Sequence, residues 1–146
     1  MLNYLGKVFK ELSVTPKLPT NLEELHESLE SFKIETNKSE NFLLINDSEK
    51  NIVVFSCPSN LEFFVLVSGY FLMEHSKLSK TILQNFIIHD VKHGYVACCF
   101  CLLPDKANRS YVTVLQSINE ECDKCGLKLC PPCVYTDFEQ TIDYSV

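Results

Sequence analysis

Several features that would place a chain in a specialised class are missing from this sequence of 146 residues. Its longer apolar runs, such as NIVVFSC and YVACCFCLL, fall far short of the ~20 residues that a membrane-spanning helix needs. The N-terminus, MLNYLGKVFKELSVTPK, lacks the uninterrupted apolar core of a signal peptide. We therefore expect an intracellular protein with no membrane partner.

An excess of basic residues is missing as well. The formal net charge is -6, whereas a nucleic-acid-binding domain normally presents a basic surface that neutralises phosphates. This balance disfavours tight DNA binding by the chain alone. No Gly/Pro-rich linker or internal repeat interrupts it, and 46% hydrophobic with 22% charged residues is the composition of an ordinary globular protein.

The first part of the chain, residues 1–62, predicts a helix followed by a β-hairpin. Residues 19–32 are expected to be helical, because Thr20 and Glu23 have the spacing of a capping box. The helix has one apolar stripe, formed by Leu22, Leu25, Leu29 and Phe32. The runs NFLLIN and NIVVFSC, joined by the polar turn DSEK, predict the hairpin. PSNLEFF permits a single helical turn after it.

The second part, residues 63–146, predicts an α/β (α+β) fold. Three apolar, β-rich runs at 63–73, 82–91 and 94–103 are separated by short polar segments, which favours an antiparallel meander. Helical spacing of apolar residues over 107–125, with Gly126 in a C-cap position, predicts a helix after the meander. The run CVYT then returns to the sheet as a fourth strand.

This order of elements is the ribonuclease H-like plan, on which nucleases and transposases use carboxylates to hold two divalent metal ions. From Phe42 onward the chain resembles the transposases of Mutator-like elements. The resemblance rests on five pieces in order, which are FLLINDSEKNIVVFSCPSNLEFF, VSGYF, the run from ILQNFIIHDV to VTVLQSI, LLPDK followed by Tyr111, and GLKLCPPCVYTDFEQTI. It implies an incomplete, degenerate domain of that family at 63–146.

The departures from the family decide what the resemblance implies about chemistry. Asp137 stands at the position of the second catalytic acid, but Ser68 replaces the first, and the helix that carries the third is missing before Val146. The family implies Mg²⁺, DNA and a nuclear setting. One acid of three implies instead a transposase-derived protein that is not an enzyme and holds no cofactor. Any residual role is in binding, with an unpaired sheet edge open to a protein partner. The alternative is a fragment of an active DNA transposase or nuclease that continues beyond Val146.

The late cysteines support a further alternative. Cys122, Cys125, Cys130 and Cys133 form two C-x-x-C units, and four thiolates complete the tetrahedron that zinc prefers. Their separation of four residues is much tighter than that of zinc ribbons. In the competing interpretation they are reduced thiols around a helix end and a strand, like the buried cysteines expected at Cys98, Cys99 and Cys101. We favour the second interpretation and therefore expect no metal site.

Overall fold

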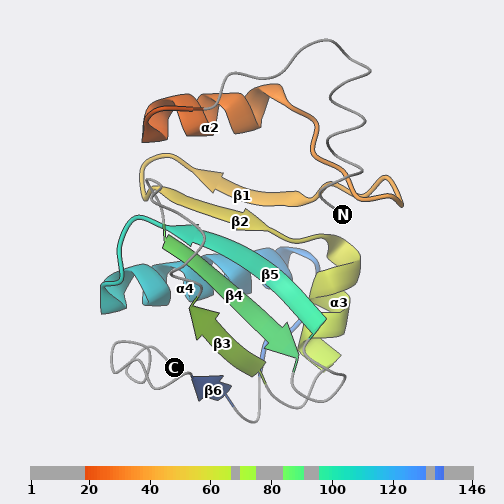
Figure 1. The fold of residues 1–146 in the computed structure, drawn as a ribbon. Helices are drawn as coiled ribbons and strands as arrows, with labels where there is room; N and C mark the ends of the chain where they lie inside the picture. Colours follow the sequence, from red (N-terminus) through yellow and green to blue (C-terminus); the bar gives the residue numbers. More distant parts are fainter. Residues whose placement is uncertain (1–18, 67–69, 75–83, 91–95, 131–133, 137–146) are drawn as a thin grey trace.

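In the part of the chain that the structure describes, six strands form one mixed sheet in the order β1-β2-β5-β4-β3-β6, with three helices packed around it (Figure 1). The computed structural model describes residues 19–66, 70–74, 84–90, 96–130 and 134–136. The strands are β1 (Leu43–Asp47), β2 (Ile52–Phe55), β3 (Tyr70–Glu74), β4 (Gln84–Asp90), β5 (Val96–Leu103) and β6 (Val134–Thr136). The helices are α2 (Leu22–Ser31), α3 (Pro58–Leu66) and α4 (Asn108–Lys124).

The predicted meander and returning strand are confirmed. β3, β4 and β5 pair as antiparallel neighbours, and β6 then pairs parallel to β3, with Tyr70 beside Val134 and Leu72 beside Thr136. α4 connects β5 to β6, so the chain leaves the sheet at β5 and returns on the far side of β3 (Figure 1). The protein is therefore a small mixed α/β protein built around a three-stranded antiparallel core.

The N-terminal hairpin, also confirmed, belongs to the same sheet. β1 pairs with β2, and β2 pairs antiparallel with β5, where Val54 lies opposite Cys101 and Phe55 opposite Phe100. The expected boundary between residues 1–62 and 63–146 falls inside α3. Backbone hydrogen bonds therefore join the two parts of the chain across β2 and β5.

One face of the sheet carries the main core, under α3 and α4 (Figure 1). Along α4 the side chains that are buried recur every three or four residues, as the helical spacing predicted. They meet alternate residues of β5 and β2, because successive side chains of a strand point to opposite faces. The buried cluster includes Ile52, Val54, Leu61, Phe64, Cys99, Cys101, Leu103, Tyr111, Val114, Ile118 and Cys122.

The segment 58–66 corrects the sequence analysis. A single helical turn and a strand beginning at Phe63 were expected, but α3 continues for nine residues to Leu66. Leu61 and Phe64, three positions apart on one helix face, are both buried at 1% exposure or less. Glu40 caps the start, since its carboxylate accepts hydrogen bonds from the Ser59 backbone N–H at 3.1 Å and hydroxyl at 2.6 Å. These hydrogen bonds hold the pKa of Glu40 below its usual range.

The start of α2 is shifted by one residue from the predicted capping box. Asn21 is the N-cap, its side chain accepting from the Glu24 N–H at 2.8 Å, while Glu24 accepts from the backbone and hydroxyl of Thr20. The side chain of α2 that is buried is His26, not one of the leucines. Asn46 of β1 donates to the His26 carbonyl at 3.1 Å and accepts from His26 Nδ1. This reciprocal pair fixes α2 to β1.

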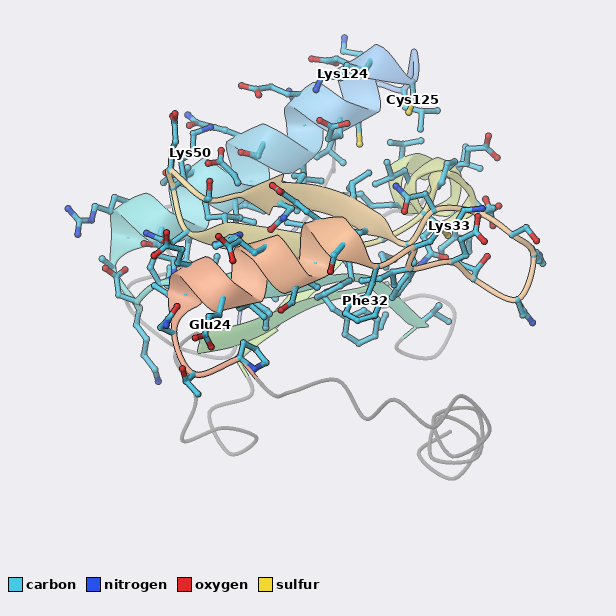
Figure 2. All side chains as sticks on the ribbon, turned by 90° about the horizontal axis from the view of Figure 1, so that it is seen from above. Glu24, Phe32, Lys33, Lys50, Lys124 and Cys125 are labelled. Carbon is cyan, nitrogen blue, oxygen red and sulfur yellow. The ribbon has the colours of Figure 1, made fainter. Side chains whose placement is uncertain are left out.

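α2 lies on the sheet face opposite α3 and α4. Asn46 stands opposite Val53 in the β1–β2 register, so both side chains point to the same face, and Val53 is fully buried there. Figure 2 shows α2 and α4 on opposite sides of the strands. None of the helices in the described ranges has both the length and the apolar character to cross a bilayer.

Candidate functional site

The two positions that the family resemblance assigns to catalysis, Ser68 and Asp137, both lie outside the described residues. Their nearest described neighbours in the chain's two parallel strands are Tyr70 and Thr136. In the β3–β6 register Thr136 stands beside Leu72, two residues beyond Tyr70, which is about 7 Å along a strand. The described register does not by itself set the two positions side by side.

The end of α4 determines how the first C-x-x-C unit is presented. Gly126 adopts a left-handed conformation with φ of +72°, as its predicted C-cap role requires. Its N–H donates to the Asp123 carbonyl at 3.0 Å, and the Leu127 N–H donates to the Cys122 carbonyl at 2.9 Å. These are the two hydrogen bonds of a Schellman motif, which reverses the chain and packs Leu127 against the core.

This geometry places the thiols in different environments. Cys122 is fully buried among core side chains, whereas Cys125, at the C-cap, and Cys130 are exposed; Cys133 lies outside the described residues. Burial raises the pKa of the Cys122 thiol to about 11, and the negative charges of Cys125, Asp123 and Glu121 add smaller increases. Zinc binds the thiolate, so a thiol held protonated is a poor ligand. Across the described ranges no three His, Cys, Asp or Glu side chains gather closely enough to hold a metal ion.

We expect purified protein to carry little zinc, and a chelator to leave its melting temperature almost unchanged. A structural four-thiolate site would contribute ~10 kcal/mol or more to folding, so its loss would unfold the chain. Elemental analysis and thermal melts with and without chelator measure both quantities. Near-stoichiometric zinc that disappears in a Cys130→Ser/Cys133→Ser double variant would contradict the expectation.

The cysteines of β5 are core residues, as predicted. Cys98, Cys99 and Cys101 are each exposed by 1% or less. Cys98 stands where the register between β4 and β5 shifts, so two consecutive thiols enter the same core. Burial raises the pKa of Cys99 to about 12, an effect that a hydrogen bond with Ser56 opposes and the neighbouring thiols reinforce. These groups are unreactive packing residues.

A groove of about 330 Å³ lies between the β1–β2 turn and the start of α4. Lys50 and Arg109 line it, which would favour an anion. Each cation already faces a carboxylate, Lys50 at 3.2 Å from Asp47 and Arg109 at 3.5 Å from Asp105. Asp105 also accepts hydrogen bonds from the Ala107 N–H and the Ser110 hydroxyl. It is not the N-cap of α4, which is Ala107 and has no side-chain cap hydrogen bond. The local charges cancel, and the groove gives no anion-binding site.

An aromatic surface on the α2 side of the sheet was not predicted. We define it by Phe32, Phe42, Phe55 and Phe100. The Phe42 ring stacks on Phe55 at a centroid distance of 6.0 Å and meets Phe100 edge-on at 6.4 Å. Phe32 and Phe100 are 53% and 39% exposed. Figure 2 shows Phe32 at the end of α2, on the side of the sheet away from α4.

The sequence held only part of the signal for this surface. Phe55 and Phe100 lie in strand runs that are apolar throughout. Without an alternation of polar and apolar residues, the sequence does not indicate which side chains point to which face of the sheet. Their proximity depends on the pairing of β2 with β5, which joins residues 45 positions apart. The N–H of Phe42 donates to the Ile34 carbonyl at 2.8 Å, which brings the segment after α2 beside them. Large exposed apolar groups that cluster in this way mark interaction sites.

Comparisons with known proteins identify no relative. No protein-family model, curated protein or solved structure matches this chain. The family resemblance therefore continues to rest on the residues quoted for it.

Proposed function

We propose that this chain is a transposase-derived protein of the Mutator-like type that has lost catalysis and acts by binding. The observation that supports this proposal best is the strand order β5-β4-β3-β6, in which β6 runs parallel to β3 and is reached through α4. A ribonuclease H-like sheet has this order and these directions. Such an ancestry also favours a nuclear location.

The donor set does not fit the two divalent ions that the family uses. At the aligned positions the chain offers the carboxylate of Asp137 and the hydroxyl of Ser68. A neutral hydroxyl does not offset the charge of a cation, and Mg²⁺ requires six near-octahedral oxygen ligands while giving up its waters reluctantly. Two-metal chemistry needs carboxylates that hold both ions against the attacking and leaving oxygens. We therefore assign no catalytic step to this chain.

A binding role has a structural candidate at the edge of the sheet. Within the described residues β6 pairs with β3 alone, so its other side presents backbone N–H and C=O groups. Unpaired edges of this kind accept an added strand from a partner polypeptide. The net charge of -6 makes a protein partner a better match than DNA.

The proposal predicts no cleavage or strand transfer of DNA with Mg²⁺ or Mn²⁺. Asp137→Asn should leave both the fold and the biochemical behaviour unchanged. Ser68→Asp alone should not restore activity, because the resemblance assigns only two acid positions within residues 1–146, whereas the family uses three. A supercoiled-plasmid nicking assay with all three proteins at equal concentration measures this.

The decisive opposite result is metal-dependent nicking by the wild-type chain that Asp137→Asn abolishes. That outcome would assign Asp137 to a working metal site and favour an active nuclease. Nicking that survives Asp137→Asn would point to a contaminating enzyme in the preparation.

A further inference from the structure

The aromatic surface begins where α2 stops covering its face of the sheet. Under α2, Val53 is fully buried. Beyond the end of α2, Phe32 and Phe100 are 53% and 39% exposed, and Phe42 packs its ring between Phe55 and Phe100. Aromatic side chains carry a large hydrophobic area, so this uncovered part of the face favours an apolar partner.

The chain itself contains a segment with matching chemistry. Residues 1–18, MLNYLGKVFKELSVTPKL, lie outside the described residues. Their apolar side chains include Leu2, Leu5, Phe9 and Leu12, which recur with the spacing of one helix face. The segment has three lysines and one glutamate, a net charge of +2, so the rest of the chain carries -8. Opposite charges favour its association with the remainder of the molecule.

The connection is long enough for this contact within one molecule. Residues 13–21 join Leu12 to the start of α2 at Leu22, and nine extended residues span up to ~30 Å. α2 has ten residues, which at 1.5 Å each make it about 15 Å long. The segment can therefore run back along α2 and reach Phe32 at its far end.

We propose that residues 2–12 dock in cis on the aromatic surface and cover Phe32 and Phe100. The chain's own N-terminal segment then continues the apolar layer that α2 begins on this face. The inference stands apart from the transposase ancestry, since it uses no residue of the catalytic positions.

The absence of tryptophan from the chain gives a direct test. A full-length Phe9→Trp variant contains a single tryptophan, and its emission reports the surroundings of that position. We expect emission at shorter wavelength, and weaker quenching by acrylamide, than in a free peptide of residues 1–18 with the same substitution. Emission and quenching equal to those of the free peptide would overturn the proposal.

Matched variants locate the contact. Phe32→Lys or Phe100→Lys, placed in the Phe9→Trp chain, should return the emission to that of the free peptide. Leu66→Lys, at a side chain that is 83% exposed on α3, should leave it unchanged. Circular dichroism of each variant separates lost docking from lost folding. A blue shift that persists in both phenylalanine variants, or that disappears on dilution because a second copy supplies the segment, would overturn docking in cis.

Discussion

Leu61→Ala is expected to lower the free energy of unfolding by about 2–5 kcal/mol. Leu61 lies in the middle of α3, fully buried against the sheet in the cluster that α3 and α4 share. Removing most of its side chain loses the transfer free energy of the methine and the two methyl groups, and it leaves a cavity that surrounding core residues fill incompletely. Small domains of this size have only about 5–15 kcal/mol of total stability, so the change should be plain in a urea melt.

The same helix supplies a matched control for this substitution. Leu66 is 83% exposed, five residues further along α3. Leu66→Ala should change the free energy of unfolding by no more than about 0.5 kcal/mol, because it empties no packed site. Equal destabilisation by the two substitutions would show that α3 does not pack through the face that contains Leu61 and Phe64.

α3 also shows where the sequence is a poor guide to this fold. The run from Leu61 to Met73 is apolar over most of its length, and continuous apolar runs do not distinguish a buried strand from a buried helix. The helix is selected by contacts that are distant in sequence, including Glu40, which caps its start from 19 residues away. β4, β5 and α4 were predictable because polar segments, Pro104 and Gly126 bound them locally.

In the candidate sites, too, features fixed by neighbouring residues could be predicted, and features fixed by residues distant in sequence could not. The positions of Cys122 and Cys125 on α4 could be predicted, because helix spacing and the glycine at the C-cap fix them. The aromatic surface could not, since it requires the registers of β1, β2 and β5 together. The buried His26 was missed for the same reason. Its partner, Asn46, is 20 residues away on β1.

The buried thiols are expected to lower the free energy of unfolding strongly at alkaline pH. The pKa of Cys99 is about 12 in the folded protein, against an ordinary value of 9.0, chiefly because burial desolvates its thiolate. Since the folded pKa is the higher one, the contribution of this thiol is fully present below pH 9. It is lost as pH rises toward 12, where the unfolded chain releases the proton and the folded chain retains it. Burial likewise raises the pKa of Cys101 and of Cys122.

Each pH unit in that window removes about 1.4 kcal/mol for one such thiol. Wild-type protein should therefore lose about 1.4 kcal/mol more than a Cys99→Ala variant between pH 8 and pH 10, measured as the change in unfolding free energy by urea titration. Cys99→Ala is expected to be less stable at pH 8, because it leaves a small cavity, but its stability should fall less steeply. Leu66→Ala is the matched control, since it removes an exposed side chain that carries no ionisable group, and it should follow the wild-type slope. Parallel curves for wild type and Cys99→Ala would show that folding does not hold the Cys99 thiol protonated, and the buried position of β5 beneath α4 would then need revision.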